Sequence, residues 1–354
     1  MKAVIMAGGE GSRLRPLTCD LPKPMARLCG KPALEYILQL LQKHGVTEAA
    51  VTLRYLPHVI ENHFDTGHYN GVSLRFVEEN TPLGTAGGVK NAAKEFSEPF
   101  VVISGDALCD FDLTAATRAH QESGADATIL VTRVGDPREY GLVSCTQDGF
   151  VSGFVEKPAW TQASTDLANT GIYLLNPKVL SLIPDDRSYD FAANLFPLML
   201  SKGMKILAFE AKGYWCDIGD LASYLSCQRD MLTGLVQVAL PPEQGQRVFS
   251  MEELPKGDYK IFPPVYLGRR VKIGEGAVIG PDVILGDGVT VGEQARIRGS
   301  AVLDDAFVGD SARLTGAVVC AGASIKKGAA LFEGAVVGTT AVVGENAEIL
   351  PRVS

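Results

Sequence analysis

Aliphatic residues recur every six positions in the last part of the 354-residue chain, from Val271 onward. A first column comprises Val271, Ala277, Val283, Val289, Ala295, Ala301 and Phe307 and, past an Arg313 that breaks the pattern, Val319, Ile325, Leu331, Val337, Val343 and Ile349. A second column comprises Ile273, Ile279, Leu285, Val291, Ile297 and Leu303. This period is typical of a left-handed parallel β-helix, in which three short faces make one coil and aliphatic side chains stack inside. We therefore predict such a β-helix over residues 265–354, because a β-sandwich needs no period of six.

The predicted β-helix contains no histidine, since all five precede it: His44, His58, His63, His68 and His120. Acyltransferases commonly use a histidine as general base. We therefore expect no acetyl transfer and assign the β-helix to spacing or to formation of a homo-oligomer. Its last hexad begins at Ile349, close to the end of the sequence at Ser354. An uncapped coil exposes backbone groups, so we expect either that this end packs on another subunit or that a longer polypeptide continues into a further domain.

Up to about Gly234 the chain alternates strand-like and helix-like stretches. The strand-like stretches are 2–6, 49–53, 72–78, 100–104 and 127–134; the helix-like ones are 33–44, 57–64, 85–96, 113–123 and 220–232. Such alternation predicts an α/β domain with a mainly parallel sheet. Closer-spaced apolar runs at 141–145, 150–156 and 169–175 indicate added antiparallel strands. We predict an α/β domain over 1–234, a Pro-, Gly- and Gln-rich linker over 235–264, and the β-helix after it.

Composition narrows the class of partner. Hydrophobic residues make up 46% of the chain and the net charge is −8, which argues against nucleic acid or anionic membranes as general partners. No apolar run approaches the roughly 20 residues of a membrane helix, and the apolar start is too short for a signal peptide. The seven cysteines are scattered and form no CxxC pair. These features predict a cytoplasmic protein without a disulfide framework or a zinc site.

Residues 8–25, GGEGSRLRPLTCDLPKPM, are strongly basic for so acidic a chain. The glycines allow the backbone to approach a ligand and to present N–H groups to it. Arg13 offers a planar fork for phosphate oxygens, and Lys23 is held between two prolines. The third glycine of a dinucleotide fingerprint and the Gly-Lys-Ser/Thr of a P-loop are both missing. We therefore interpret the loop as a triphosphate site, the alternative being a basic surface turn.

The segment MAGGEGSRLRPLTCDLPKPM (6–25) resembles the signature of the nucleoside-diphosphate-sugar pyrophosphorylases, which are sugar-1-phosphate nucleotidyltransferases, with Ser12 where threonine is usual. Further resembling stretches follow in the family's order: PLGTAGGVKNA (82–92), VVISGDALCDFDL (101–113), FVEKP (154–158), NTGIYLLNP (169–177) and YWCDIG (214–219). Hexapeptide β-helices also occur in this family. The resemblance covers essentially the whole chain and implies a Rossmann-like, GT-A-like domain followed by a left-handed β-helix.

The implied reaction joins an NTP and a sugar 1-phosphate into an NDP-sugar and pyrophosphate. It needs no protein nucleophile, because a phosphate monoester is mostly dianionic at pH 7 and can attack the α-phosphorus in line. The similarity is greatest to mannose-1-phosphate guanylyltransferases, which implies GTP, mannose 1-phosphate and GDP-mannose. Relatives that use UTP or dTTP with glucose 1-phosphate, or heptose 1-phosphate, carry similar strings. A non-catalytic regulatory subunit that binds an NDP-sugar is a further alternative.

The resemblance also implies the site residues. The proposed catalytic residues, whose joint presence favours an enzyme over a regulatory subunit, are Arg13, Lys23, Asp106, Lys157 and Asp217. Asp106 and Asp217 are expected to hold Mg²⁺, a cation that prefers carboxylate and phosphate oxygens. The expected nucleotide-binding residues are Ala7, Gly8, Gly9, Gly11, Ser12, Arg13, Lys23, Leu83, Gly84, Thr85 and Asp106. The expected sugar-phosphate residues are Gly141, Glu156, Lys157, Asn169, Thr170 and Gly171.

Overall fold

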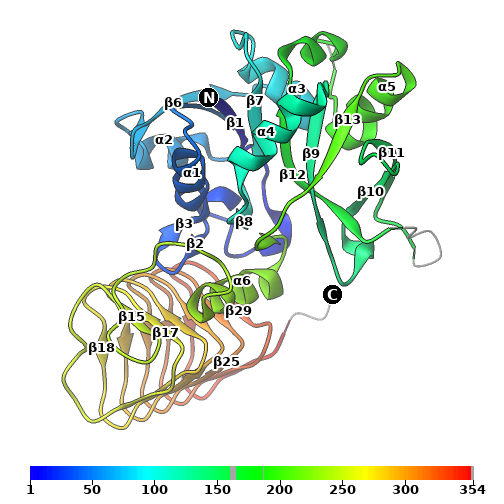
Figure 1. The fold of residues 1–354 in the computed structure, drawn as a ribbon. Coiled ribbons are helices and arrows are strands. Elements are labelled where there is room, and N and C mark those ends of the chain that lie inside the picture. The colour runs from blue at the N-terminus through cyan, green and yellow to red at the C-terminus, as the bar shows by residue number, and fades with distance from the viewer. Residues whose placement is uncertain (160–164, 186, 352–354) are drawn as a thin grey trace. The chain divides into compact units, whose positions relative to one another are not determined.

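The computed structural model describes residues 1–159, 165–185 and 187–351 (Figure 1). The contacts between residues divide the chain into two compact units. The α/β unit comprises Met1–Glu10 and Leu34–Asp217, and the β-helix unit comprises Gly11–Ala33 and Ile218–Ser354. The basic loop therefore belongs by its contacts to the β-helix unit, although the sequence places it near the start of the α/β part.

The α/β unit is built on a mixed sheet whose path runs β11-β10-β12-β7-β1-β4-β6-β5, with β9 paired to β12 and β13 paired to β9 (Figure 1). Its strands are β1 (Lys2–Met6), β4 (Glu48–Leu53), β5 (His68–Tyr69), β6 (Val72–Glu78), β7 (Phe100–Ser104), β9 (Ala127–Arg133), β10 (Gly141–Cys145), β11 (Val151–Glu156), β12 (Leu167–Leu175) and β13 (Ile206–Glu210). β7, β1, β4 and β6 run parallel, and β12 runs antiparallel to β7 and β9. The predicted α/β fold with a mixed sheet is confirmed.

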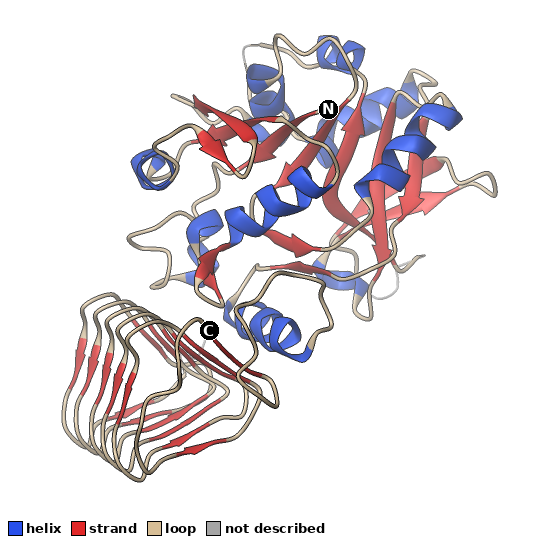
Figure 2. Ribbon diagram, turned by 60° about the vertical axis from the view of Figure 1, so that its left-hand side comes forward, coloured by secondary structure: helices blue, strands red, loops and turns tan. Residues whose placement is uncertain are grey.

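Continuous apolar runs explain the parallel strands. In β7 the first four residues are buried, as expected for a strand covered on both faces. The helices are α1 (Ala33–Lys43), α2 (Pro57–His63), α3 (Gly84–Ala92), α4 (Leu113–Ser123) and α5 (Phe196–Ser201). α3 packs on β1 and β4, whereas α4 packs on β9, β12 and β13. Helices thus cover the sheet (Figure 2), and the helix expected over 85–96 ends early, at Ala92.

The β-helix unit stacks short parallel strands into three sheets (Figure 2). The first sheet contains β15 (Val248–Ser250), β17 (Val265–Leu267), β20 (Val283–Leu285), β23 (Ala301–Val302), β26 (Val318–Val319) and β29 (Val336–Val337). The second contains β16 (Lys260–Ile261), β19 (Val278–Ile279), β22 (Arg296–Arg298), β25 (Arg313–Thr315), β28 (Ala330–Leu331) and β31 (Glu348–Ile349). The third contains β18 (Lys272–Ile273), β21 (Thr290–Val291), β24 (Phe307–Val308), β27 (Ser324–Ile325) and β30 (Val342–Val343).

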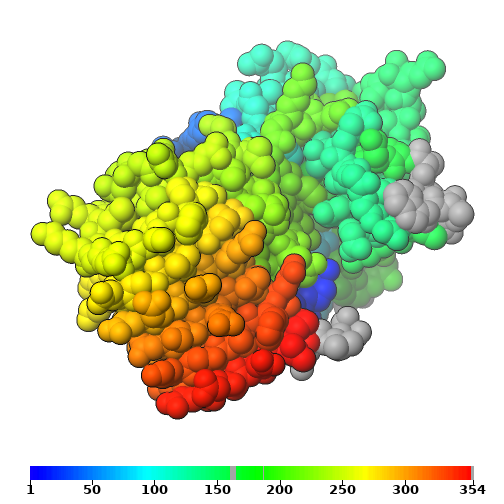
Figure 3. Space-filling view, turned by 90° about the horizontal axis from the view of Figure 1, so that it is seen from below, coloured from blue at the N-terminus to red at the C-terminus, as the bar shows by residue number. Residues whose placement is uncertain are grey.

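This arrangement confirms the predicted left-handed parallel β-helix, whose successive coils form parallel bands from yellow to red in Figure 3. The coils begin earlier than predicted. β15 and β16 lie inside the expected linker, and they pair with β17 and β19. The unit also contains α6 (Leu221–Thr233), which Asp220 caps by accepting a hydrogen bond from the Ser223 amide. Residues 352–354, the predicted end of the β-helix, lie outside the described residues.

The hexad register changes within the β-helix, so the predicted column through Phe307 and Arg313 is wrong there. Val265 pairs with Val283, which gives a coil of 18 residues. Leu285 instead pairs with Val302, and Val302 with Val319, which gives two successive coils of 17. Two corners, at Arg298–Ser300 and at Thr315–Ala317, are each one residue shorter than the corresponding corner between Ile279 and Val283. After each short corner the inward positions move by one residue.

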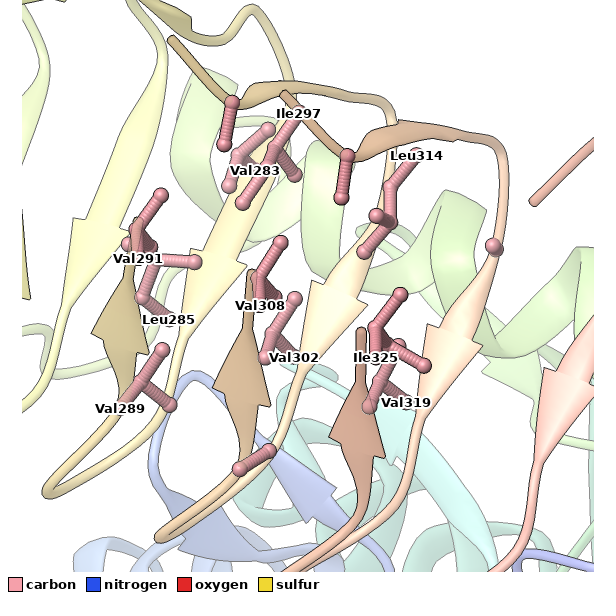
Figure 4. Close-up of a cluster of buried hydrophobic side chains, with 14 of the residues drawn as sticks. Val283, Leu285, Val289, Val291, Ile297, Val302, Val308, Leu314, Val319 and Ile325 are labelled. Atoms are coloured by element: carbon pink, nitrogen blue, oxygen red, sulfur yellow. The ribbon is translucent and has the colours of Figure 1, made fainter. Parts of the chain in front are cut away.

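The interior side chains after the short corners are therefore Val302, Val308 and Leu314, as Figure 4 shows, followed by Val319 and Ile325. Phe307 is 38% exposed, and Leu303 of the second predicted column is absent from this core. Ser300 takes the inward position of Val283 and is fully buried. Its hydroxyl donates to the Arg298 carbonyl (2.7 Å) and accepts from the Ala317 amide (3.1 Å), so it is hydrogen-bonded between the two short corners.

Candidate functional site

The two carboxylates expected to bind metal lie close together in the α/β unit. Asp106 precedes β8 (Ala107–Cys109), and Asp217 ends β14 (Trp215–Asp217). These two strands pair antiparallel with Asp217 opposite Ala107, the residue directly after Asp106. The Ser104 hydroxyl donates a hydrogen bond to Asp106 Oδ1. The strand register thus brings together two acidic residues that are far apart in the sequence.

These two side chains fit a magnesium ion. Mg²⁺ is usually bound by one or two carboxylates together with substrate phosphates and water. Asp106 and Asp217 supply such a pair, on adjacent strand ends. Across residues 1–159, 165–185 and 187–351, no group of three or more His, Cys, Asp or Glu side chains could hold a metal. A metal bound by this pair would therefore need phosphate or water oxygens to complete its coordination.

The loop that begins at Ala7 leaves the sheet at a topological switch point. β1 lies between β7 and β4, and the register pairs Met6 with Ser104 at the carboxyl ends of β1 and β7. The Gly105 amide donates to the Met6 carbonyl at 2.8 Å. Open α/β sheets bind their ligands at such a point. The expected nucleotide residues Ala7 and Asp106 therefore emerge next to each other.

Gly8 and Gly9 of this loop face different surroundings. A Cβ placed on Gly9 would meet nothing within 4 Å, so its backbone is open to a ligand. A Cβ on Gly8 would lie 3.4 Å from the Cβ of Arg54, the residue directly after β4. Arg54 was not predicted as a site residue. Its position at a strand's carboxyl end was the signal that could have found it.

Glu79 lies beside the PLGTAG stretch and was also missed by the sequence analysis. It follows β6, and its carboxylate accepts a hydrogen bond from the Leu83 amide at 3.4 Å. Burial raises the pKa of Glu79, against opposing effects of the Leu83 amide and of the Arg54 charge. A half-buried carboxylate with one amide donor gains from further donors. The other oxygen, Oε1, packs on α3, where a Cβ on Gly88 would overlap it. Glu79 is thus held at the start of α3, next to Leu83.

Gly84 and Thr85 are held by the segment that precedes α5. Gly84 has φ +74°, and a Cβ there would lie 2.7 Å from the Tyr189 carbonyl oxygen, so only glycine fits. The backbone amide and the hydroxyl of Thr85 both donate to Asp190 Oδ1 at 3.0 Å. Asp190 therefore fixes the start of α3. Sequence reasoning missed it, because nothing local links residues 85 and 190.

A cavity of about 480 Å³ collects part of the predicted sugar site. Its lining includes Gly141, Glu156 and Asn169, together with Thr85 and Asp190. Small-molecule sites typically have this size. Gly141 pairs with Glu156 across β10 and β11, and a Cβ on Gly141 would lie 2.6 Å from Glu156 Oε2. Glycine at 141 thus leaves room for the carboxylate in the cavity.

An irregularity in β12 shapes the floor of this sugar cavity. The β12–β9 register shifts between Asn169 and Tyr173, and Gly171 within that stretch has φ +74°. Asn169 accepts from the Gly171 amide (3.0 Å) and donates to the Tyr173 hydroxyl (3.2 Å). Burial raises the pKa of Tyr173 to about 12, so its hydroxyl stays protonated at neutral pH. A Cβ on Gly171 would lie 3.3 Å from Ser104 Cβ, which places this bulge next to the Asp106 support.

Thr170 and Lys157, two predicted sugar-phosphate residues, differ in their exposure to solvent. The Thr170 hydroxyl is buried and donates to the Leu130 carbonyl at 2.7 Å, and its own carbonyl accepts from the Trp215 indole. Lys157 is exposed and has φ +42°, a left-handed conformation that is uncommon for residues other than glycine. Its amide donates to the Tyr140 carbonyl, and the Tyr140 ring packs edge-on against Trp215. The same β14 strand that carries Asp217 thus supports both segments.

The remaining predicted nucleotide residues lie in the β-helix unit. Gly11 has φ +64°, and a Cβ there would lie 2.9 Å from Lys23 Cβ, so glycine permits the close approach of the two segments. Ser12 and Arg13 form a short 3₁₀ helix and are exposed. Lys23 begins a second such turn after Pro22 and is 8% exposed. The Thr18 hydroxyl donates to the Gly11 carbonyl at 2.8 Å, which closes the loop.

The signature loop continues into a hairpin that is anchored on the β-helix. The hairpin pairs β2 (Arg27–Leu28) with β3 (Lys31–Pro32). Arg27 forms an ion pair with Asp304 at 3.2 Å, and the Tyr224 hydroxyl of α6 donates to the Arg27 carbonyl at 2.7 Å. At the turn, Gly30 has φ +83°, and a Cβ there would overlap the Tyr266 hydroxyl. The basic loop is therefore built against α6 and against the coils that carry Tyr266 and Asp304.

Among the residues that the structure describes, no helix is long and apolar enough to span a membrane.

Comparison with known proteins places this site in a family. Residues 2–234 match the model described as nucleotidyl transferase, and residues 261–353 match the GMPPB C-terminal domain. The UTP–glucose-1-phosphate uridylyltransferase of Synechocystis is 36% identical over 78% of this chain and 76% of its own length. The Xenopus laevis mannose-1-phosphate guanyltransferase beta-A is 37% identical over 66% of this chain, and the match spans 64% of that relative.

A bacterial relative and a solved structure extend the comparison. The mannose-1-phosphate guanylyltransferase of Mycobacterium tuberculosis is 32% identical over 78% of this chain and 75% of its own length. The crystal structure of HddC from Yersinia pseudotuberculosis complexed with GMP-PN superposes with a TM-score of 0.56 and 31% identity, and it covers 65% of this chain and 99% of that chain.

Proposed function

Because the chain belongs to the nucleotidyl transferase family, we propose that it transfers a guanylyl group from GTP to mannose 1-phosphate, releasing pyrophosphate and GDP-mannose. The broader activity, nucleotidyl transfer to a sugar 1-phosphate, is common to the Synechocystis, Xenopus and Mycobacterium relatives. The choice of guanine rests on one observation, the half-buried carboxylate of Glu79 beside Leu83.

Glu79 favours guanine over a pyrimidine for a chemical reason. Guanine presents two adjacent N–H donors, at N1 and N2, on its Watson–Crick edge, and a carboxylate can accept both. Uracil and thymine present a single N–H between two carbonyl oxygens, which a carboxylate would repel. The Leu83 amide already donates to Glu79 Oε2, so the carboxylate is oriented before the base arrives.

The chemistry itself requires positioning and charge neutralisation rather than a nucleophilic side chain. The sugar-phosphate oxygen attacks the α-phosphorus in line with the departing pyrophosphate. Lys157 would bind the phosphate of the sugar, while Glu156 and Asn169 in the 480 Å³ cavity would hold the sugar hydroxyls. Arg13 and Lys23 would neutralise the triphosphate, a role that rests on the family resemblance. A Mg²⁺ held by Asp106 and Asp217 would supply further neutralisation of phosphate charge.

A substrate grid tests the proposal. Pyrophosphate release is measured with GTP, UTP, dTTP, ATP and CTP against mannose, glucose, galactose and heptose 1-phosphates, with Mg²⁺ and with EDTA. We expect the GTP–mannose 1-phosphate pair to give the highest kcat/KM and EDTA to abolish release. A preference for UTP or dTTP with glucose 1-phosphate would contradict the substrate assignment and keep the reaction. Absence of release with every pair would favour a regulatory, NDP-sugar-binding protein.

Substitution of Glu79 tests the base assignment directly. Glu79→Gln keeps the shape but replaces one acceptor oxygen with a donor amide. Hydrogen bonds to charged groups contribute about 1.5–3 kcal/mol, so the ratio of kcat/KM for GTP over UTP should narrow roughly 10- to 100-fold. Glu78→Gln is the matched control, because Glu78 is an exposed neighbour at the end of β6. An unchanged ratio in Glu79→Gln would show that another group reads the base.

A further inference from the structure

A second cavity, of about 700 Å³, lies wholly within the β-helix unit. We call it the corner groove. One wall is the face of α6 that carries Ala222 and Arg229, and the opposite wall is the corner between the second and first sheets, where Arg298 and Thr315 lie. Arg13 of the signature loop also lines it. Its volume falls in the range of small-molecule sites.

The corner groove coincides with the departure from the β-helix repeat. Both short corners, Arg298–Ser300 and Thr315–Ala317, contribute residues to its lining. Gly299 and Gly316 at these corners have left-handed φ values of +56° and +59°. A Cβ on Gly299 would meet nothing nearer than 3.8 Å, whereas a Cβ on Gly316 would lie 3.0 Å from Glu333 Cγ, so Glu333 covers the second corner. Each of these two corners is one residue shorter than a full-length corner and carries a glycine, so it occupies less space along this edge of the β-helix. The groove also runs past the full-length corners of Asp282 and of Glu333 and Gly334, so the two short corners form its middle part.

The charges around the groove are mixed, but several are already engaged. Asp220 caps α6, accepting from both the amide and the hydroxyl of Ser223 at 2.8 Å. Arg229 lies 3.5 Å from Asp230. In the part of the chain that the structure describes, Arg13 and Arg298 have no ion pair within 4 Å, and both are exposed. Burial opposes the lowered pKa of Asp220, which the Ser223 hydrogen bonds and the charge of Arg13 bring about, so Arg13 is attracted to Asp220 at longer range.

Two kinds of ligand group would satisfy this lining. A guanidinium matches phosphate oxygens in a planar, two-point geometry, and Arg13 and Arg298 provide two of them. The carboxylates of Asp282 and Glu333 line the same groove and accept hydrogen bonds from hydroxyl or N–H donors. A ligand that carries a phosphate and several hydroxyl groups meets both demands, whereas a purely cationic ligand meets only the carboxylates and an apolar ligand meets neither.

We propose that the corner groove is a second ligand site, which binds a phosphorylated sugar or nucleoside through Arg13 and Arg298. The phosphate lies against the two guanidinium groups, and the hydroxyl-bearing part lies over the glycine corners toward Asp282 and Glu333. Because Arg13 is also the residue assigned to the triphosphate, occupation of the groove lowers the affinity for GTP. This last consequence rests on the proposed function, whereas the binding itself does not.

Calorimetric titration of the full chain, without substrates, tests the binding. The probes are inorganic phosphate, glucose 6-phosphate and GMP, which separate the phosphate from the sugar and nucleoside parts. Arg298→Glu reverses one charge of the groove on an exposed corner. Arg296→Glu is its matched control, since Arg296 is an exposed arginine on the same strand β22 that does not line the groove. Ala222→Trp fills the groove from α6 without changing its charge.

We expect glucose 6-phosphate or GMP to bind more tightly than inorganic phosphate. That binding should weaken at least tenfold in Arg298→Glu and in Ala222→Trp, and less than twofold in Arg296→Glu. Far-ultraviolet circular dichroism and a thermal melt establish that each variant is folded. The proposal is overturned if no organic probe binds, if inorganic phosphate binds as tightly as both, or if the affinities are the same in wild type and Arg298→Glu.

A kinetic measurement tests the coupling separately. With mannose 1-phosphate saturating, the organic probe should raise the KM for GTP in the wild type and in Arg296→Glu, and leave it unchanged in Arg298→Glu. Arg298→Glu should keep the basal kcat. An equal rise in KM in all three proteins would place the probe in the catalytic site and overturn the coupling. If the wild type binds the probe but shows no nucleotidyl transfer, the proposed function is contradicted, whereas the assignment of the corner groove as a ligand site is supported.

Discussion

The α/β unit and the β-helix unit differ in regularity, and in both units polar side chains gather where regularity fails. The sheet of the α/β unit is interrupted by the β12 bulge at Asn169–Tyr173, and Lys157 has a left-handed backbone. The β-helix repeats closely but loses one residue at each of two corners, where the 700 Å³ groove lies. Departures from local rules are where functional sites are expected, because elsewhere every local preference agrees with the fold.

The two units were predictable from different features of the sequence: the β-helix from its period of six, and the candidate site of the α/β unit from short motifs. In the β-helix, the period of six predicted the core. It did not predict the groove, because a strict period does not allow for corners that are one residue shorter. In the α/β unit, short motifs named candidate ligands such as Asp106 and Asp217, yet they gave no register. Only the pairing of β8 with β14 shows that these two lie together.

The largest expected effect concerns Asp106, the predicted metal-binding carboxylate of the α/β unit. Asp106→Asn keeps the size of the side chain and its capacity to accept from Ser104, but it removes the charge. Turnover should fall by about 10²–10³-fold or more, because groups that stabilise developing charge contribute on that scale. Asp112→Asn removes the same charge nearby and keeps the cap of α4, so it should leave turnover unchanged. Pyrophosphate release and a thermal melt measure both, and near-normal turnover of folded Asp106→Asn would refute the role of this carboxylate.

An intermediate effect tests whether the signature loop depends on the β-helix. Gly30→Ala adds a methyl group to a left-handed residue and against the Tyr266 hydroxyl. Backbone strain of about 1–2 kcal/mol and overpacking of about 1–3 kcal/mol should together lower the free energy of unfolding by about 2–5 kcal/mol. Urea denaturation measures it. Tyr266→Leu in the same chain should recover the overpacking part only, so a double-mutant cycle separates the two causes. Strict additivity of the two substitutions would contradict the packing of this turn on the first coils.

The smallest expected effect concerns the regular part of the α/β unit. His120 is 2% exposed, and its Nδ1 lies 2.8 Å from the Thr128 hydroxyl oxygen. Burial lowers the pKa of His120, although Asn176 and Asp126 act in the opposite direction. The stability gained from the neutral ring is present above the unfolded-state pKa of about 6.5 and is lost as pH falls below it. His120→Gln should reduce the fall in the free energy of unfolding between pH 7.5 and pH 5.5, measured by urea denaturation, by no more than about 1 kcal/mol. An identical pH profile in the variant would contradict this.

The fold class, the β-helix and the motifs could be predicted from the sequence. The residues and contacts that were not predicted have physical reasons in common. Glu79 and Arg54 were missed because their site is created by strand order, which places the ends of β6 and β4 beside Leu83 and Gly8. Asp190 was missed because it reaches Thr85 across a long stretch of chain. The anchoring of the signature hairpin on α6 and on Asp304 was not predicted either, since no local pattern marks a contact between such distant segments.

The short corners also show where the β-helix can accommodate the deletion or insertion of a single residue. A single-codon deletion inside a strand would turn its neighbours' side chains from interior to surface. At Arg298–Ser300 and Thr315–Ala317 the missing residue is absorbed by the corner, and the following hexads resume their stacking with Val302 and Val319 inside. Insertion of one residue at either corner would therefore leave the interior stacking unchanged and alter only the shape of the groove. The corners of this β-helix are therefore positions at which the chain can lose or gain one residue while the interior stacking is kept.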